Sequence, residues 1–335
     1  MPESLRLTRG GPLHLGVNYR LHYGYDFANS DLSVANPNRL ARVHADFAEL
    51  ARHEARILRW FLWNDGRTVM SHSGPLTWNR SALRAGLDAA AEHGLSVLLV
   101  LLDHTFCFAE ERDGSLVKQG FGLWIKEEER FARLLEELLQ PAIAEAGAHA
   151  AVMGFEFINE PEMAMRRRGW WLGPQTGVGC EKVPPAWQLT LTEMRTRMRS
   201  VAALVHRVGK QFSVGSMSSR WVGQWEEVLD PAADFLNFHY YGEAHERDLN
   251  AMIETRILPL AERIAIGFGE FYPCGARVVP PSRARSPWPD HTLSDFFRAS
   301  QRYRLQLAMP WVWNPGSCDP GQIPMEEWAA HTGLD

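Results

Sequence analysis

The sequence lacks the features that mark membrane-spanning, exported and nucleic-acid-binding proteins. No stretch reaches the roughly 18 uninterrupted apolar residues of a membrane helix, so we expect no membrane association. Residues 1–11 contain no apolar segment of the kind found in signal peptides, and we therefore expect a cytoplasmic protein. The formal net charge of −5 gives no reason to expect nucleic acid as a partner.

Cysteine is scarce as well. The chain has four cysteines, which are widely spaced and form no CxxC pair: Cys107, Cys180, Cys274 and Cys318. Zinc sites built on thiolates need closely spaced pairs, and disulfides are rare in reducing compartments. We therefore expect free thiols, no zinc site and no cofactor.

The chain does have ample material for a large core. Of its 335 residues, 45% are hydrophobic and 22% are charged, as in an ordinary globular protein. Thirteen tryptophans are many for this length. Some of them must be core residues, but aromatic faces also stack on sugar rings.

Eight short apolar runs alternate with longer amphipathic or polar stretches. The runs expected to be strands are Leu13–Arg20, Ala55–Trp63, Leu95–Thr105, Ala151–Glu160, Gln211–Ser218, Phe235–Tyr241, Ile264–Phe271 and Ala308–Asn314. The stretches expected to be helices are Pro37–Arg52, Ser81–His93, Lys126–Gln140, Gln188–Val208, Leu249–Glu262 and Leu293–Leu305. A strand–helix unit repeated in this way predicts an α/β fold, a single-domain (β/α)8 TIM barrel over residues 1–335.

The connections between these elements are uneven in length. Between the fifth strand and the sixth, only residues 221–229 are left for a helix, so the helix of the fifth unit must be short. Two stretches rich in glycine and proline, Gly169–Pro185 and Val279–Pro289, are too short for domain linkers and predict long loops that follow strands. In a barrel such loops crowd the carboxyl-terminal face, where we expect the functional site.

Two of the apolar runs end in a glutamate. The run at residues 151–160 ends abruptly in Asn159 and Glu160, and Pro161 should stop the strand because proline cannot donate to a sheet ladder. The run at residues 264–271 ends the same way in Glu270. Two buried strands that each carry one glutamate at the tip suggest an acid and a base that face one another.

Other polar and aromatic side chains lie at the ends of the remaining strands. Those at or near the carboxyl ends are Arg59, Asp103, His104, Asn159, His239, Tyr241, Trp311 and Trp313. Because a closed barrel brings these ends together, we expect the side chains to converge on one pocket with Glu160 and Glu270.

On these residues the sequence resembles the retaining β-glycosidases of glycoside hydrolase clan A, and most closely family 5, the cellulase and mannanase family. Residues 159–161 (Asn-Glu-Pro) are similar to the family's acid/base motif after strand four, and residues 269–271 (Gly-Glu-Phe) to its nucleophile motif after strand seven. Types that the family keeps at matching positions are found at Arg59, His104, His239, Tyr241 and a tryptophan on strand eight. The resemblance covers strands two to eight and implies a barrel enzyme that hydrolyses β-linked glycosides with retention.

The chemistry of such an enzyme assigns different roles to the two glutamates. A retaining glycosidase uses two carboxyl groups about 5 Å apart. We expect Glu160 to be the acid/base, protonated at rest because apolar walls and the charge of Glu270 raise its pKa. Glu270 is then the nucleophile, kept ionised by Arg59 and by a hydrogen bond from the Tyr241 hydroxyl.

Three more residues are expected to support this pair. Asn159 would donate to the sugar 2-hydroxyl, and Trp313 would form the floor under the reacting ring. Glu156 shares a strand face with Glu160 and should point into the barrel. A buried carboxylate needs a partner, so we expect Glu156 to pair with Arg59 and to support the site without taking part in the chemistry.

The histidines leave alternatives open. Either His104 and His239 hydrogen-bond to substrate hydroxyls and to the nucleophile, which their positions favour, or they are packed histidines with satisfied nitrogens. A metal site would combine them with Asp103 and the glutamates. A barrel hydrolase of that kind needs a His-x-His pair on an early strand, where this sequence has Asn18, so we expect no metal. Asn18 and Asp103 are expected to contact substrate instead.

Tryptophans near the strand ends are candidates for sugar binding outside the point of cleavage. They are Trp63 after strand two, Trp170 and Trp171 in the long loop after strand four, and Trp311 on strand eight. The alternative is that these rings pack the loops onto the barrel.

The sequence thus predicts a retaining hydrolase that acts on a carbohydrate, of β-glucan or β-mannan type, through a covalent glycosyl-enzyme on Glu270. A transglycosylase that uses the same site is a close variant. A non-catalytic carbohydrate-binding barrel is the alternative from a different class, but binding alone has no need of a buried acid beside a buried base.

Overall fold

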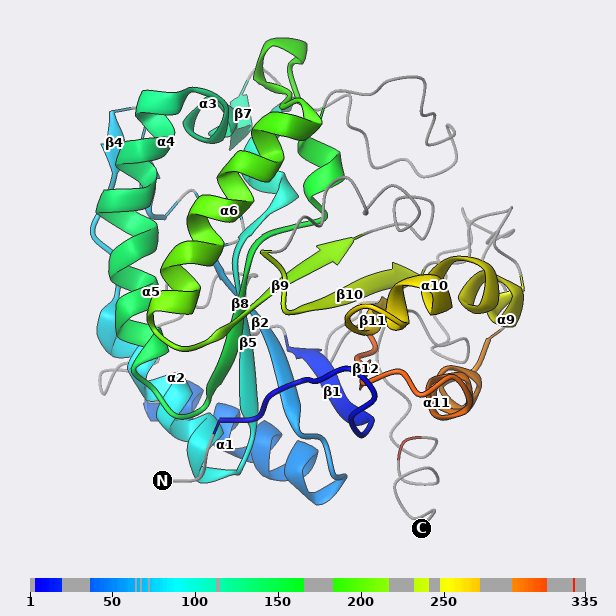
Figure 1. Ribbon diagram of the computed structural model, residues 1–335. Coiled ribbons are helices and arrows are strands. Elements are labelled where there is room, and N and C mark those ends of the chain that lie inside the picture. Colours follow the sequence, from blue (N-terminus) through cyan, green and yellow to red (C-terminus); the bar gives the residue numbers. More distant parts are fainter. Residues whose placement is uncertain are drawn as a thin grey trace.

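The computed structural model describes residues 4–19, 37–63, 65–66, 68–71, 73–112, 115–165, 183–216, 232–240, 248–271, 291–311 and 328. Its centre is a closed barrel of parallel strands in the order β1-β12-β11-β10-β9-β8-β5-β2 (Figure 1). These strands are β1 (His14–Tyr19), β2 (Ile57–Trp63), β5 (Ser96–Asp103), β8 (Val152–Asn159), β9 (Gln211–Ser216), β10 (Phe235–Tyr240), β11 (Ala265–Phe271) and β12 (Leu307–Ala308). The predicted (β/α)8 barrel is therefore confirmed.

Helices surround the barrel, with α3 to α6 on the left of Figure 1 and α9 to α11 on the right. They are α1 (Pro37–Arg52), α2 (Arg80–Glu92), α3 (Gly122–Lys126), α4 (Glu128–Leu134), α5 (Gln140–Gly147), α6 (Leu191–Arg207), α9 (Leu249–Met252), α10 (Leu258–Ala261) and α11 (Leu293–Arg302). Shorter turns are the 3-10 segments η2 (His104–Cys107), η4 (Pro161–Ala164) and η6 (Pro185–Trp187), and the π segments η3 (Leu135–Leu139) and η7 (Ile253–Ile257). Two small hairpins, β3 (Met70–Ser71) with β4 (Gly74–Pro75) and β6 (Ala109–Arg112) with β7 (Ser115–Gln119), lie outside the barrel sheet.

Local sequence signals explain where several helices begin and end. α6 and α11 start with capping boxes, in which Thr190 pairs with Glu193 and Thr292 with Asp295. Gly94 follows α2 with a positive φ of 70°, a conformation that costs little only for a residue without a β-carbon. These signals fix the turns that return the chain from each helix to the next strand.

Two helical segments continue through proline by widening one turn. Before Pro141 the N–H of Gln140 donates to the carbonyl of Leu135, five residues back, in the π segment η3. The π segment η7 precedes Pro259 in the same way. Proline has no N–H and its ring clashes with the carbonyl four residues back, so a wider turn relieves the conflict. The helix predicted to end at residue 140 therefore extends to residue 147.

The last strand is shorter than its apolar run predicts. β12 has only two residues, where the sequence predicts a strand over residues 308–314. Pro310 cannot donate to the ladder, although the N–H of Trp311 still bonds to the carbonyl of Phe271 at 2.9 Å. The helix predicted in the fifth unit and most of both predicted long loops lie outside the described residues.

The barrel interior is filled in layers. Its lowest layer is apolar and consists of Leu7, Ile57, Leu98, Met153, Phe235, Ala265, Leu307 and Met309. The segment before β1 closes this end, because Gln211 accepts from the backbone N–H of Leu7 at 2.8 Å and donates to its carbonyl at 2.9 Å. The amino-terminal end of the barrel is thereby closed.

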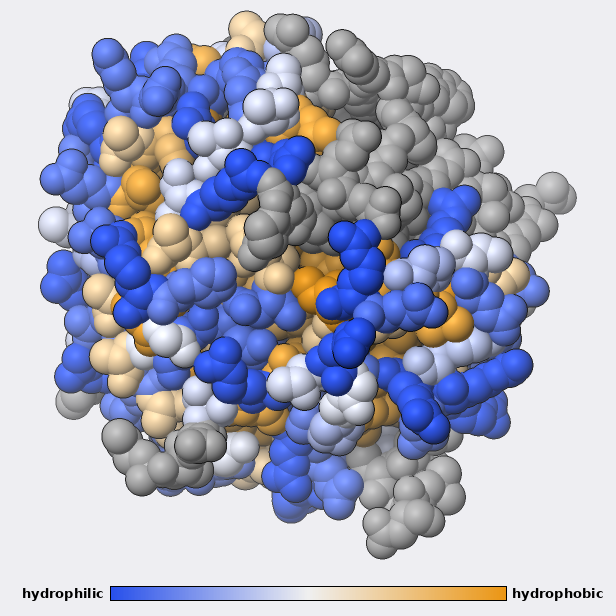
Figure 2. Space-filling model, in the orientation of Figure 1, coloured by the Kyte–Doolittle hydropathy of each residue, from blue (hydrophilic) through white to orange (hydrophobic). Residues whose placement is uncertain are grey.

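The outer surface is mixed in character. Figure 2 shows hydrophilic side chains spread over the helices, with small apolar patches between them. Among the described residues, Leu76 is the large apolar side chain that is clearly exposed, at 45%. Within the described part of the chain, no helix has both the length and the apolar character needed to cross a bilayer.

The apolar layer predicts a strong dependence of stability on Leu98. Leu98→Ala removes a fully buried side chain from this apolar layer, and we expect a loss of about 2–5 kcal/mol in the free energy of unfolding. The matched change Leu76→Ala, at an exposed position, should cost under about 1 kcal/mol. Chemical denaturation of both variants measures the difference, and equal losses would contradict the layered interior.

Candidate active site

Arg59 of β2 is the centre of the polar layer above the apolar one. Its Nε and Nη2 donate to the two oxygens of Glu156 at 3.0 and 2.8 Å, and Nη2 also donates to Asn159 at 2.7 Å. Its Nη1 donates to Asn18 Oδ1 at 2.9 Å and to Glu270 Oε1 at 2.5 Å. A guanidinium has five N–H groups, and all five are used here. Burial opposes the charge, but Glu156 and Glu270 raise the pKa of Arg59, so it stays protonated.

A second set of residues holds Glu156 in place. Asn237 of β10 donates to Glu156 Oε1 at 2.6 Å and to Ser213 Oγ of β9 at 2.8 Å. Two glycines leave room for this network. A β-carbon at Gly215 would lie 2.8 Å from Glu156 Oε2, and one at Gly269 would lie 1.9 Å from Asn237 Oδ1. Glycine within these strands therefore marks a close approach of side chains.

Glu160 reaches the pocket through an unusual backbone conformation. It follows β8 with φ 49° and ψ 58°, in the left-handed region that costs a non-glycine residue roughly 1–3 kcal/mol. Its N–H donates to the carbonyl of Gly215 at 3.1 Å, and its own carbonyl accepts from Met163 at 3.0 Å. Neighbouring residues of an extended strand point to opposite faces. The left-handed turn lets Asn159 and Glu160 both face the pocket.

Glu270 is placed by a different irregularity. The pairing of β10 with β11 is regular up to Phe238 and then shifts by one residue, so that His239 lies opposite Glu270. The extra residue is Gly269, whose carbonyl accepts from Asn18 Nδ2 at 2.8 Å. Such bulges redirect the side chain that follows them. Here the bulge brings Glu270 beside both Arg59 and His239.

The two glutamates meet at His239. Nδ1 of His239 lies 2.8 Å from Glu160 Oε1, as a hydrogen bond, and 3.5 Å from Glu270 Oε2. One carboxylate oxygen of each glutamate and one ring nitrogen of His239 lie within 4.8 Å of one another. Glu160 is 6% exposed and Glu270 is 2% exposed, so the pair is almost removed from solvent.

The surroundings of Glu160 favour its protonated form. Burial raises its pKa well above the ordinary value, and the negative charges of Glu270, Glu162 and Asp103 raise it further, against a smaller opposing effect of Arg59. The pKa of His239 is lowered well below its ordinary value, chiefly by burial and also by Arg59 and His104.

Asp103 and His104 lie on the other side of Glu160. Asp103 accepts from Asn159 Nδ2 at 2.9 Å and from Thr105 Oγ1 at 2.7 Å. Nδ1 of His104 lies 3.0 Å from Asp103 Oδ1 and 3.3 Å from Glu160 Oε2, but neither contact has the direction of a hydrogen bond. Burial would raise the pKa of Asp103, yet the charge of His104 and the hydrogen bonds lower it to about 2. Asp103 thus orients Asn159 as an ionised carboxylate.

The structure brings together the predicted polar residues, with two differences in their contacts. Glu156 pairs with Arg59 as expected. The histidines were expected to contact the nucleophile, but the hydrogen bond of His239 goes to Glu160, and His104 lies against Asp103 and Glu160. Nε2 of His239 has no hydrogen-bond partner among the described residues.

Asn18 is bonded to other groups of the protein. It is 1% exposed, accepts from Arg59, and its Nδ2 lies within hydrogen-bond distance of the carbonyls of Gly269, Met309 and Pro310. These contacts occupy the side chain that was expected to reach substrate. Asn18 therefore ties β1 to the ends of β11 and β12.

The predicted sugar-stacking tryptophans divide into two groups. Trp63 is fully buried and packs edge-on against Trp78, with ring centroids 5.6 Å apart, which fits the packing alternative. Trp311 is partly exposed and meets Phe61 edge-on, with ring centroids 6.0 Å apart. The other predicted contacts, Trp170, Trp171, Tyr241 and Trp313, lie outside the described residues.

Glu160, His239 and Glu270 are also close enough to hold one metal ion. A cation there would lie beside the guanidinium of Arg59, whose Nη1 is 2.5 Å from Glu270, and the two positive charges would repel. The arrangement is better suited to a proton donor beside an ionised carboxylate.

The same barrel occurs in several solved β-mannanases. The chain shares the (β/α)8 barrel fold with these enzymes. The β-1,4-D-mannanase of Cryptopygus antarcticus superposes with a TM-score of 0.69 at 14% identity, over 98% of this chain and 93% of that one. The endo-1,4-β-mannanase of Eisenia fetida superposes with a TM-score of 0.66 at 17% identity, over 99% of this chain and 93% of that one. The β-mannanase of the mussel Mytilus edulis superposes with a TM-score of 0.66 at 13% identity, over 96% of this chain and 90% of that one. No family model matches the sequence, and no curated protein matches it significantly.

Within this mannanase-like barrel, some site residues were not found from the sequence. Ser213 and Asn237 support Glu156. Glu162 of η4 is 4% exposed, and its charge raises the pKa of Glu160. Asn237 carried a usable signal, since it interrupts an apolar run two residues before His239 and so shares its face. Ser213 and Glu162 carried none, because their roles depend on register and on a 3-10 turn.

Removal of Arg59 should disrupt the site as a whole. Arg59→Met leaves Glu156 and Glu270 buried without a counter-charge, and we expect a loss of about 3–5 kcal/mol in the free energy of unfolding, together with loss of turnover. The control is Arg197→Met, which also removes a buried arginine, one that donates to the carbonyls of Ile125 and Lys126. It should lower stability in denaturation experiments but keep turnover. Wild-type turnover in Arg59→Met would contradict the dependence of the site on Arg59.

Proposed function

We propose that this protein is a retaining β-glycoside hydrolase, with Glu160 as the acid/base and Glu270 as the nucleophile. The observation that carries the proposal is the approach of their carboxylate oxygens to within 4.8 Å. This corresponds to the separation of about 5–5.5 Å used by retaining enzymes, whereas inverting enzymes hold their carboxyl groups about 6.5–9.5 Å apart to admit a water.

In the first step, an oxygen of Glu270 attacks the anomeric carbon while the Glu160 O–H gives its proton to the glycosidic oxygen. The bond from the anomeric carbon to the leaving group breaks, and a bond to Glu270 forms. Glu270 is held in one orientation by Arg59 Nη1, and the raised pKa of Glu160 keeps its proton available.

In the second step the roles of Glu160 reverse. As a carboxylate it takes a proton from water, whose oxygen attacks the anomeric carbon and releases Glu270. An acceptor sugar in place of water gives transglycosylation at the same site. His239, next to both carboxyl groups and kept neutral, adds no charge that would hold Glu160 ionised at the start of the cycle.

For the substrate we propose a β-1,4-linked mannoside in preference to a β-glucan. Support comes from the fold, which this chain shares with structures described as β-mannanases and, at a TM-score of 0.60 and 14% identity, with an exo-β-1,4-mannosidase from an Opitutaceae bacterium. We also keep as predictions a single domain over residues 1–335 and a cytoplasmic location.

The two glutamate roles can be separated by azide rescue. On an aryl β-mannoside with a good leaving group, Glu160→Ala should lower turnover by roughly 10²–10⁴-fold, and azide should restore it by attacking the glycosyl-enzyme to give the β-glycosyl azide. Glu270→Ala should abolish turnover, and azide should then attack from the opposite face to give the α-glycosyl azide. NMR of the products assigns the anomers.

Controls for this experiment address the alternatives. The matching aryl β-glucoside tests the choice of sugar. A chelator should leave turnover unchanged if no metal takes part in the reaction. A non-catalytic carbohydrate-binding barrel would bind sugar with no turnover in the unmodified protein, and the same azide anomer from both variants would reject the assigned roles.

The pH dependence should follow the proton of Glu160. Because the protonated form starts the reaction and its pKa is raised, kcat/KM should fall only as the pH rises through this raised pKa. Glu162→Gln removes one of the charges that raise it, so the alkaline limb should move to lower pH. The exposed Glu137→Gln, on the outer helices, is the control and should leave the limb in place. A shift to higher pH in Glu162→Gln would contradict the role of Glu160.

A further inference from the structure

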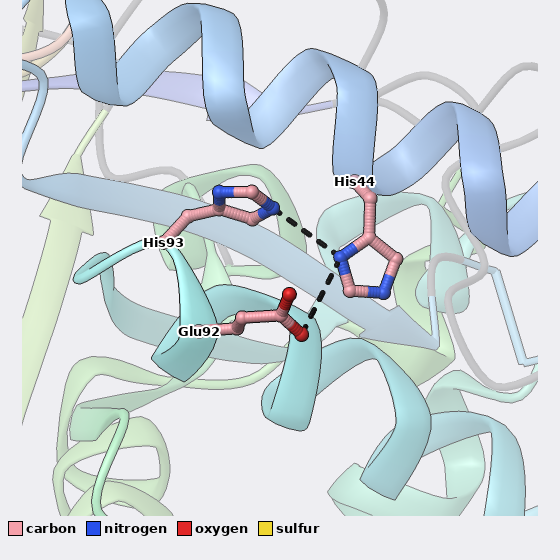
Figure 3. A group of neighbouring side chains, drawn as sticks. All are labelled: His44, Glu92 and His93. Carbon is pink, nitrogen blue, oxygen red and sulfur yellow. Dashed lines mark hydrogen bonds and ion pairs between the residues drawn. The ribbon is translucent and has the colours of Figure 1, made fainter.

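Three side chains converge far from the barrel site, between α1 and the end of α2 (Figure 3). His44 comes from α1, Glu92 is the last residue of α2, and His93 caps that helix. Nδ1 of His44 lies 3.3 Å from Nε2 of His93 and 3.8 Å from Oε2 of Glu92. The three donor atoms all lie within 4.8 Å of one another.

The separation of the two imidazole nitrogens matches one edge of a tetrahedral metal site. Two ligands about 2.0–2.1 Å from a zinc ion, at the tetrahedral angle, lie about 3.3 Å apart. The two imidazole nitrogens already have this spacing, which is long for a hydrogen bond between them. Oε2 of Glu92 lies 3.8 Å from Nδ1 of His44, so a movement of about 0.5 Å gives this pair the same separation. The Glu92 side chain is free to move because it is 69% exposed.

The backbone at this place also favours a cation. Glu92 and His93 lie at the carboxyl end of the 13-residue helix α2, where the helix dipole is negative. The turn is fixed there, because the N–H of His93 bonds to the carbonyls of Ala89 and Ala91 and Gly94 takes a positive φ. His93 is thus held in place, and His44 faces it from a separate helix.

We propose that His44, Glu92 and His93 bind a divalent transition-metal ion of the zinc class, with a fourth position open to water. Two imidazoles and one carboxylate are a ligand set that zinc accepts. Because the ligands come from two helices, the ion cross-links α1 to α2 on the outside of the barrel. Its role is therefore stabilisation of the fold, separate from the chemistry at Glu160 and Glu270.

The test uses the full chain without a histidine tag, with Zn²⁺ and Co²⁺ as probes. Calorimetric titration with Zn²⁺ should give one site per chain, and saturating Zn²⁺ should raise the Tm by a few degrees because the ion binds only the folded state. Co²⁺ should show the visible absorption of a four-coordinate ion. His44→Gln and His93→Gln should each weaken binding by more than about 100-fold and remove the shift in Tm, since the two remaining donors hold the ion much less tightly than three.

Two control variants separate this site from other places where zinc could bind. Glu270→Gln changes the other cluster of potential ligands among the described residues, Glu160 with His239 and Glu270, and should leave Zn²⁺ affinity and the Tm shift unchanged. His149→Gln removes a histidine that pairs with Asp88 on the surface, and it should also bind Zn²⁺ as before. Absence of binding at about 100 μM Zn²⁺, or unchanged binding in both His44→Gln and His93→Gln, overturns the proposal.

Discussion

The Arg59 guanidinium is the interaction on which the rest of the site depends. It is fully buried, and its five N–H groups bind four side chains from β1, β8 and β11. A buried charge is tolerated only when its surroundings compensate it, and here two carboxylates do so. The guanidinium is planar and its donors point in fixed directions, so the positions of Glu156 and Glu270 are determined relative to each other. The barrel acts as the frame that brings these partners to one arginine.

The two glutamates beside His239 are both placed by departures from regular strand geometry. Glu160 lies in a left-handed turn and Glu270 follows a bulge, although each belongs to an otherwise regular parallel strand. A regular strand would point alternate residues away from the pocket. Backbone strain is tolerated where the surroundings fix it, and Glu160 is fixed by its bonds to Gly215 and Met163. The irregularities therefore lie at the two residues whose carboxylate oxygens approach each other to within 4.8 Å.

Periodicity and composition were sufficient to predict the barrel and most of its strands. The apolar runs located β2, β8 and β11 to within two residues, because strands buried on both faces are continuously apolar. The pairing of Glu156 with Arg59 also followed from simple reasoning, since a charge in that strand needs a partner. The exact contacts of His239 did not follow, because they depend on the register shift at Gly269, and register is not visible in one sequence. The role of Asn18 was missed for a related reason, since its carbonyl partners come from strand ends about 250 or more residues away along the chain.

The division of the Arg59 contacts along the chain has a consequence for how the two halves of the barrel are joined. Arg59, Asn18, Glu156 and Asn159 all come from the first 159 residues, whereas Glu270 and His239 come from the second half of the barrel. The amino-terminal half can thus neutralise its own buried cation. One N–H of Nη1 donates to Asn18, and the other is left to engage Glu270. Glu270 belongs to β11, so its contact with Arg59 links the second half of the barrel to the partners that β1 and β8 supply.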